Sequence, residues 1–199
     1  MILIGLTGSI GMGKSTAAGM LKKMGCAIHD ADQAVREALS PNGGAFEEVA
    51  VTFPTCWDKK NHLIKRDILS EIIFNDDDKR IELENILHPI VQMSQRTFIQ
   101  KQQRLEQDIV VLDIPLLFET GAQNRVDYTF VVSAPHHIQK RRVLSRPNMS
   151  EEKFYAILQN QMPDNEKKLY ADFVISTGMG LAYTYKNLQK AIKEIKEQK

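Results

Sequence analysis

The sequence predicts an α/β fold with a doubly wound, five-stranded parallel sheet, a helical insertion and a helical lid. Three observations lead to this prediction. Short apolar runs, typical of buried parallel strands, recur at residues 2–6, 26–29, 109–114, 128–133 and 173–176. Segments with helical spacing separate these runs at lengths that suit parallel crossovers. A glycine-rich turn directly follows the first run, as at a strand–loop–helix junction.

The glycine-rich turn spans residues 8–16 and reads Gly-Ser-Ile-Gly-Met-Gly-Lys-Ser-Thr, which fits the phosphate-loop (Walker A) pattern. Such a turn lets successive backbone N–H groups converge on phosphates, and the following helix adds its positive N-terminal end. Lys14 can reach the β- and γ-phosphates, the Ser15 hydroxyl can coordinate Mg²⁺, and Thr16 can donate to a phosphate oxygen. The expected nucleotide-binding residues are Gly8, Gly11, Met12, Gly13, Lys14, Ser15 and Thr16. The motif indicates a nucleoside-triphosphate site in a phosphate-loop NTPase fold.

The spacing of the strands predicts the domain organisation. The first helix should cover residues 14–24, with Gly25 just beyond its end. Roughly 80 residues separate the second and third strands, far more than one crossover needs, so we expect an inserted helical domain at 58–106. Within it, Pro89 should kink or interrupt a long helix unless a new one starts there.

The remaining segments complete this scheme. Residues 1–57, 107–144 and 169–199 should form the nucleotide-binding core, and 145–168 a lid. The tail from 181 reads as an amphipathic helix in which apolar positions alternate with both signs of charge, which favours packing on the sheet over membrane binding.

Candidate acceptor-side residues follow the second strand. If a helix begins near Asp30, Asp32 and Arg36 share one face. A carboxylate there can accept a hydroxyl proton, and a guanidinium can hold an anionic group of the acceptor. A helix cap followed by a surface salt bridge explains the same spacing equally well.

Asp113 ends the third apolar run, where phosphate-loop enzymes place the acid that holds Mg²⁺ directly or through water. A strand-end cap is the alternative. Glu119, a few residues later, could line the acceptor pocket or simply be exposed.

After the fourth run, Arg142 and Arg146 share a helical face, which suits adenine stacking and phosphate neutralisation. A solvated basic helix face would look the same.

Composition excludes several classes of protein. Lys and Arg number 26 against 25 Asp and Glu, so the net charge of +1 gives no general reason to expect nucleic acid or an anionic membrane as partner. Cys26 and Cys56 are too few for a disulfide framework, and no Cys/His spacing suggests zinc. The first apolar run is short and leads into the phosphate loop, so it reads as a strand and not a signal peptide. We therefore expect a cytoplasmic enzyme with reduced thiols, acting as a monomer or weak homo-oligomer.

Several motifs together resemble one family. They are the opening Gly-Leu-Thr-Gly-Ser-Ile-Gly-Met-Gly-Lys-Ser-Thr, Asp30-Ala31-Asp32 with Arg36, Leu87-His88-Pro89, Pro115-Leu116-Leu117-Phe118-Glu119, and Gln139 with Arg142 and Arg146. In this order they look like the dephospho-coenzyme A kinase family, over nearly the whole chain. The phosphate loop is shared with a vast superfamily, whereas the joint occurrence of the other motifs is specific.

The resemblance implies a transferase that passes the γ-phosphoryl group of ATP, with Mg²⁺, to the ribose 3′-hydroxyl of dephospho-coenzyme A. Asp32 would be the general base, and Lys14 and Arg142 would stabilise the moving phosphoryl group. The acceptor side would comprise Asp32, Arg36, His88, Pro115 and Glu119, whereas Ser15 and Asp113 would be the metal ligands.

Three positions depart from the family pattern. The family often carries Arg where Ile157 stands and Asn where Thr177 stands, so a lid arginine and an adenine-edge contact are in doubt. Met12 replaces a usual Ser at a position that contributes its backbone N–H.

Other functions fit the phosphate loop too. A nucleoside or nucleoside-monophosphate kinase would share the core and the lid arginines. A GTP-dependent switch is disfavoured because no Gly stands two residues after Asp113. A nucleic-acid-binding ATPase lacks the expected positive charge.

Overall fold

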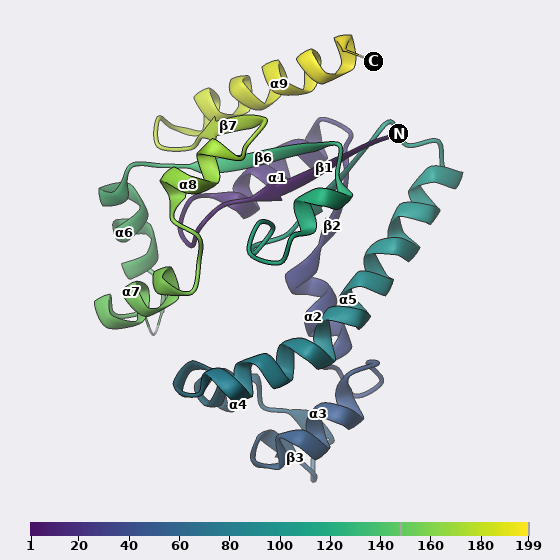
Figure 1. The fold of residues 1–199 in the computed structure, drawn as a ribbon, viewed down its shortest axis with the longest axis vertical. Coiled ribbons are helices and arrows are strands. Elements are labelled where there is room, and N and C mark those ends of the chain that lie inside the picture. Colours follow the sequence, from purple (N-terminus) through teal and green to yellow (C-terminus); the bar gives the residue numbers. More distant parts are fainter. Residues whose placement is uncertain (148, 199) are drawn as a thin grey trace. The chain divides into compact units, whose positions relative to one another are not determined.

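All five expected strands are found in one sheet of the computed structural model, which describes residues 1–147 and 149–198. They are β1 (Ile2–Thr7), β2 (Ala27–Asp30), β5 (Ile109–Asp113), β6 (Tyr128–Ser133) and β7 (Phe173–Ser176). The strand order is β2-β5-β1-β6-β7, and β1 pairs in parallel with β5 and with β6 (Figure 1). The predicted doubly wound parallel sheet is confirmed.

The chain divides into two compact units, which we call unit one (residues 1–29 and 102–199) and unit two (residues 30–101). The helical insertion expected at 58–106 falls largely within unit two, which also contains two helices that precede residue 58. The function of each segment stays a prediction.

Unit one surrounds the sheet with helices. They are α1 (Lys14–Lys23), α6 (His136–Leu144), α7 (Glu151–Gln159), α8 (Asp164–Leu169), α9 (Leu181–Glu197) and the short 3-10 helix η2 (Ala122–Arg125). The first helix ends as expected, since Met24 caps it and Gly25 takes a left-handed φ of 89°. The tail helix also forms as predicted.

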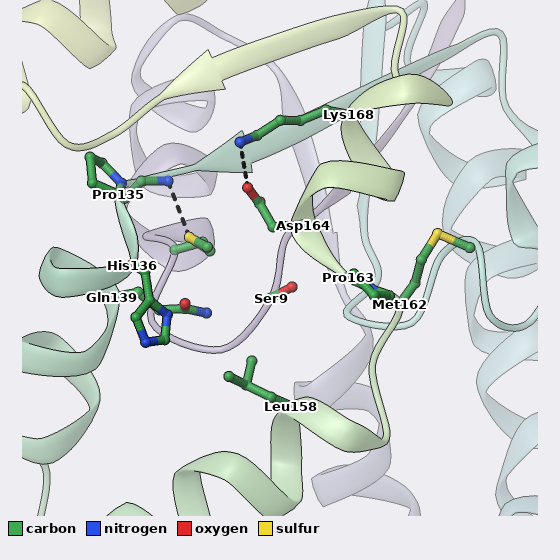
Figure 2. Close-up of a pocket in the computed structure, with 11 residues that line it drawn as sticks. Ser9, Pro135, His136, Gln139, Leu158, Met162, Pro163, Asp164 and Lys168 are labelled. Atoms are coloured by element: carbon green, nitrogen blue, oxygen red, sulfur yellow. Dashed lines mark hydrogen bonds and ion pairs between the residues drawn. The ribbon is translucent and has the colours of Figure 1, made fainter.

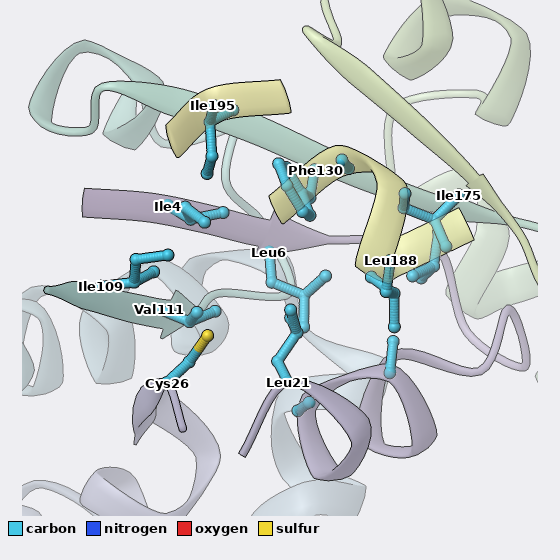
Figure 3. Packing of buried hydrophobic residues seen from close by; sticks show 14 of the residues in the cluster. Ile4, Leu6, Leu21, Cys26, Ile109, Val111, Phe130, Ile175, Leu188 and Ile195 are labelled. Carbon is cyan, nitrogen blue, oxygen red and sulfur yellow. The ribbon is translucent and has the colours of Figure 1, made fainter. Parts of the chain in front are cut away.

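The core of unit one joins strands to α1 and α9. Figure 3 shows Ile4 and Leu6 of β1 and Phe130 of β6 packed in one cluster with Leu21 of α1 and Leu188 of α9. All five side chains are fully buried. Removing this apolar surface from water fixes the helices against the sheet and so fixes the loop that connects β1 to α1.

Unit two is mostly helical. Its elements are α2 (Ala31–Ala38), α3 (Phe46–Thr52), η1 (Pro54–Cys56), β3 (Trp57–Asp58), β4 (Leu63–Ile64), α4 (Arg66–Asn75) and α5 (Asp77–Arg104), the last of which continues into unit one. A separate cluster that includes Phe46, Phe53 and Leu83 forms its core. The short antiparallel hairpin of β3 and β4 was not predicted from the sequence.

The helix α5 passes through Pro89 without ending, so the alternative that Pro89 interrupts it is wrong. The helix is bent (Figure 1). A bend is expected in a helix that contains a proline, because proline lacks an N–H and crowds the preceding turn. The Asp76 carboxylate accepts a hydrogen bond from the Lys79 N–H and so caps the start of the helix. In the part of the chain that the structure describes, no helix combines the length and apolar character needed to cross a bilayer.

Candidate active site

The loop between β1 and α1 leads into a helix whose first N–H groups are available to a ligand. Gly13 precedes the helix with φ 89° and ψ 22°, and no side chain caps the helix. The first N–H groups of a helix have no acceptor within the helix, so those of Lys14, Ser15 and Thr16 form a positive end that suits phosphate. A Cβ atom on Gly8 would lie 2.3 Å from Cγ2 of Val132, so only glycine fits there without displacing β6.

Lys14 and Asp113 meet at the carboxyl ends of β1 and β5. The parallel register places Leu6 opposite Asp113, so the helix that follows β1 begins beside this carboxylate. The Lys14 ammonium donates to the Asp113 carboxylate, which is almost fully buried. The two residues that the sequence assigned to phosphate and metal binding therefore lie together within unit one.

Arg142 contacts the phosphate loop through Thr177, the residue after β7. Its Nη2 donates to the Thr177 carbonyl at 2.7 Å, and its Nη1 donates to the Thr177 hydroxyl at 3.1 Å and to the Gly11 carbonyl at 3.4 Å. The Thr177 hydroxyl in turn donates to the Met12 carbonyl at 2.6 Å. Arg142 and Thr177 thus hold two loop carbonyls, those of Gly11 and Met12.

Two glutamines hold the loop at Ile10. Gln139 on α6 donates through Nε2 to the Ile10 carbonyl at 2.9 Å. The Ile10 N–H donates to Oε1 of Gln161 at 3.0 Å. Gln139 stands one helical turn before Arg142, so its position on the same face of α6 was visible in the sequence. No sequence signal places Gln161 at the loop.

Other expected nucleotide-side residues are exposed. Ser15, Thr16 and Arg146 face solvent, and the structure records no hydrogen bond or ion pair for their side chains with any described residue. Ser15 follows Lys14 directly, so its hydroxyl lies on the first turn of α1. Arg146 follows the end of α6 and remains a predicted phosphate ligand.

Glu119 takes part in a network around a buried lysine that the sequence did not predict. Its Oε1 accepts from the Lys167 ammonium at 2.8 Å and from the Met162 N–H at 2.8 Å. Lys167 is fully buried, and its Nζ also lies 3.4 Å from the Pro115 carbonyl, which accepts from the Thr7 hydroxyl at 2.9 Å. This network anchors the end of the expected lid to the loop after β5. Contact of Pro115 or Glu119 with the acceptor stays a prediction.

A pocket of about 410 Å³ lies beside the phosphate loop in unit one (Figure 2). Ser9 and Met12 of the loop line it, together with Gln139 of α6 and residues of α7 and α8. Asp164 at the start of α8 accepts from the Ser133 hydroxyl at 2.8 Å and pairs with Lys168 at 2.5 Å. The first turn of α8 is therefore fixed to the end of β6 on one side of the loop.

Asp32 and Arg36 line a second pocket, of about 630 Å³, which lies entirely within unit two. Both belong to α2, so the shared helical face that their spacing predicted is confirmed. The cap is Asp30, whose carboxylate accepts from the Gln33 N–H at 2.9 Å and lies 3.9 Å from the Arg36 guanidinium. Asp32 is exposed and has no ion pair or hydrogen bond with a described residue. The cap-and-salt-bridge alternative thus applies to Asp30 and leaves Asp32 free.

His88 does not line this pocket. The side chain is exposed on α5, whereas the preceding Leu87 is buried and does line the pocket. A role for His88 at the acceptor stays a prediction. Arg66 and Arg80 also line the pocket, and sequence reasoning missed both of them.

Comparison with known proteins gives consistent matches over the whole chain. The family model described as dephospho-CoA kinase matches residues 2–182. The dephospho-CoA kinase of Mesorhizobium japonicum is 44% identical over 199 residues, which cover 100% of this chain and 99% of that protein. That of Bartonella quintana is 44% identical over 195 residues, covering 98% of each chain.

Solved structures give the same result. A protein from Thermus thermophilus has a TM-score of 0.83 at 34% identity, over 97% of this chain and 96% of that one. The dephospho-CoA kinase from Campylobacter jejuni has a TM-score of 0.71 at 29% identity, over 98% of both chains. A shikimate kinase from Bacteroides thetaiotaomicron, at 14% identity over 98% of both chains and a TM-score of 0.52, shares the fold alone.

Proposed function

The chain belongs to the dephospho-CoA kinase family, and on that premise we propose that it passes the γ-phosphoryl group of ATP directly to the ribose 3′-hydroxyl of dephospho-CoA. As a member of this family, the chain is an ATP-dependent kinase that phosphorylates dephospho-CoA in coenzyme A synthesis. The proposal adds the hydroxyl that reacts and the residues that act on it. A nucleoside kinase or a GTP-dependent switch has no comparable support.

The observation that carries the proposed mechanism is the state of Asp32. Its carboxylate is exposed in a pocket of about 630 Å³ and has no partner among the described residues. A carboxylate without competing donors can accept a hydroxyl proton. In the proposed step the acceptor oxygen bonds to the γ-phosphorus, its proton passes to Asp32, and the bond to the ADP oxygen breaks. The products are coenzyme A, ADP and a proton.

The donor side supplies alignment and positive charge. The N–H groups at the start of α1 would bind the phosphates, and Lys14 would reach the β- and γ-phosphates by leaving Asp113. Since phosphoryl transfer leaves little covalent chemistry to the protein, these groups contribute by holding and neutralising the moving group.

Asp113 and Ser15 fit a Mg²⁺ site by their chemistry. Mg²⁺ in such sites takes one or two protein oxygens and completes its shell with phosphate oxygens and water. A buried carboxylate beside Lys14 and an exposed hydroxyl on the next residue are donors of that kind. When bound, Mg²⁺ would neutralise charge on the β- and γ-phosphates.

The arginines have distinct proposed tasks. Arg142 makes three hydrogen bonds to Thr177 and Gly11, which hold its guanidinium beside the phosphate loop, where it would bind ATP and help to stabilise the moving phosphoryl group. Arg146 is exposed and would neutralise phosphate. Arg36 and His88, with Pro115 and Glu119, remain the proposed acceptor contacts.

We also propose that residues 145–168 close as a lid and exclude water, which limits hydrolysis of ATP. The acceptor-binding part would be unit two (residues 30–101), which begins earlier than the insertion that the sequence predicts at 58–106. The partners are the small molecules ATP and dephospho-CoA, with no nucleic acid or membrane, and the enzyme acts in the cytoplasm as a monomer or weak homo-oligomer.

An acceptor comparison tests the proposal. The purified protein would be incubated with Mg-ATP and, separately, dephospho-CoA, nucleosides and nucleoside monophosphates, and the phosphorylated products would be separated and identified by mass and by NMR. We expect coenzyme A, phosphorylated at the 3′-oxygen, to dominate. Faster phosphorylation of a nucleoside, or a phosphate on the 2′-oxygen, would refute the proposal.

A further inference from the structure

Three arginines from three different helices line the pocket in unit two. Arg36 belongs to α2, Arg66 is the first residue of α4, and Arg80 belongs to the first turn of α5. Asp32 lines the same pocket. The sequence assigned an anion to Arg36 alone, so the other two arginines have no role yet.

Arg66 is free to bind a ligand. The side chain is exposed, and the structure records no ion pair or hydrogen bond for it with any described residue. Its helix starts at Arg66 itself, and Lys65 before it provides no capping side chain. The uncapped start of α4 therefore adds backbone donors and a positive helix end to the guanidinium.

Arg80 has an unused donor. Its guanidinium pairs with Asp77 at 2.8 Å and lies 3.9 Å from Glu84. Its Nε atom, however, is buried without any hydrogen-bond partner among the described residues. A buried donor without an acceptor costs free energy, which a ligand oxygen would recover.

The carboxylates that line the pocket are not paired with all of its arginines. Asp32, Asp67 and Glu84 line it, but Glu84 lies against Arg80, and the structure records no ion pair between Arg66 and any described carboxylate. Apolar side chains form the remaining wall, among them Leu69, Leu83 and Leu87. Such a pocket suits a molecule that carries a localised anion together with an extended uncharged portion.

From these observations we propose that Arg66 and Arg80, with Arg36, form the subsite that binds the diphosphate of the acceptor. The inference rests on the proposed function, because dephospho-CoA carries a diphosphate between its ribose and its pantetheine chain. Arginine is suited to this task because its planar fork offers paired donors to phosphate oxygens. The three arginines would thus determine that an acceptor with a diphosphate is chosen over a nucleoside with the same hydroxyl groups.

Steady-state kinetics of Arg66→Gln, Arg80→Gln and the double variant test this subsite. We expect each single change to raise the KM for dephospho-CoA on the order of 10-fold, with kcat and the KM for ATP changed less than about threefold. Arg66→Lys should restore part of the affinity, since it keeps the charge and loses the fork. Adenosine, used as a competitor of dephospho-CoA at saturating ATP, should keep its inhibition constant in every variant.

Two control variants separate binding from structure. Arg96→Gln removes an exposed arginine of α5 that does not line the pocket, and it should leave all constants unchanged. Asp77→Asn removes the ion-pair partner of Arg80 but keeps the guanidinium, and it should not raise the KM for dephospho-CoA. Thermal unfolding followed by circular dichroism would show that each variant is folded.

The outcomes distinguish this inference from the proposed function. A wild-type protein that does not phosphorylate dephospho-CoA overturns the function and the subsite together. An active wild-type protein whose arginine variants keep the KM for dephospho-CoA, or raise the KM for ATP equally, overturns the subsite alone. An Asp77→Asn variant that matches Arg80→Gln would assign Arg80 a purely structural role and so overturn its part in the subsite.

Discussion

The phosphate loop and the pocket of unit two differ in how far their polar side chains are paired with other residues. In the loop, Lys14 pairs with Asp113, and Arg142 and Thr177 bond to each other and to loop carbonyls. In the pocket of unit two, Asp32 and Arg66 have no hydrogen bond or ion pair with a described residue. The side chains around the phosphate loop hold the loop in place, whereas Asp32 and Arg66 are exposed to solvent on their helices.

This difference separates two kinds of recognition. A phosphate chain is bound mainly by backbone N–H groups, which need a fixed loop, so the neighbouring side chains serve to hold that loop. On our proposal the acceptor is recognised by side chains, whose free charges would give selectivity. Changes in unit one should therefore affect nucleotide binding and stability, and changes in the pocket of unit two should affect the acceptor alone.

The largest effect expected in unit one comes from Lys14→Ala. Loss of the ammonium that stabilises the transferring phosphoryl group should lower kcat on the order of 10³-fold, as for the loss of one strong preorganised donor. Lys23→Ala removes an exposed lysine at the other end of α1 and should leave kcat unchanged. Stopped-time product assays give both values; a kcat for Lys14→Ala close to that of wild type contradicts the donor role.

Asp32→Asn is the matching change in unit two. It should lower kcat on the order of 10²-fold or more because the hydroxyl proton loses its acceptor. The affinity for ATP, measured by calorimetry, should stay nearly constant. Asp67→Asn removes another exposed carboxylate of the same pocket and serves as control. Equal loss of kcat in the two variants would remove Asp32 as the base.

Lys167→Met tests how far internal contacts stabilise unit one. It leaves the Glu119 carboxylate with one backbone donor and no cation, which should lower the free energy of unfolding by about 3 kcal/mol. Adding Glu119→Gln should restore part of the loss, since no unpaired charge remains. Arg66→Met in unit two should change it by less than about 0.5 kcal/mol. Urea unfolding measures all three, and equal losses from the Lys167 and Arg66 changes would abolish the contrast between the units.

Thr177→Val should give a smaller effect on the loop. The side chain keeps its shape but loses the hydroxyl that donates to Met12 and accepts from Arg142. We expect the KM for ATP to rise about 10-fold and the KM for dephospho-CoA to change little. Thr177→Ser keeps the hydroxyl and should behave as wild type. A variant that alters both KM values equally would show that the hydroxyl acts on more than the loop.

The smallest effect concerns the two cysteines, one in each unit. Burial raises the pKa of the Cys26 thiol to about 11 and also raises the pKa of Cys56 above its usual value near 9. The folded chain therefore retains thiol protons that the unfolded chain releases, so stability should fall as pH rises from about 9 to about 11. Urea midpoints at pH 8 and pH 10.5 measure this fall, and Cys26→Ala should reduce it. A midpoint that rises with pH in this range contradicts the assignment.

The sequence predicted those parts of the fold and site that depend on local pattern. Apolar runs identified the strands, and the glycine-rich motif fixed the place of Lys14 because the loop and its helix are adjacent in the chain. Asp113 was found because a carboxylate at the end of a buried parallel strand points to the ligand-binding edge.

What the sequence did not reveal depends on contacts between distant residues. Thr177 and Met12 are 165 positions apart, and Gln161 and Ile10 are 151 apart. No periodicity encodes such pairs. Nothing in the sequence indicates that Lys167 is buried, because a lysine among charged neighbours is typical of a surface residue. For Met12 only the backbone N–H was expected to matter, yet its side chain is buried and its sulfur accepts from the Ala134 N–H.

The bond between the Ile10 N–H and Gln161 has a consequence for how nucleotide and lid communicate. The amide oxygen of Gln161 accepts from that N–H at 3.0 Å. A phosphate oxygen that is to bind the Ile10 N–H must displace the Gln161 oxygen, which would remove one of the contacts that hold the chain after α7, while the Met162 N–H still donates to Glu119. On the proposed function, a phosphate oxygen and the Gln161 side chain would therefore compete for a single proton donor, the Ile10 N–H.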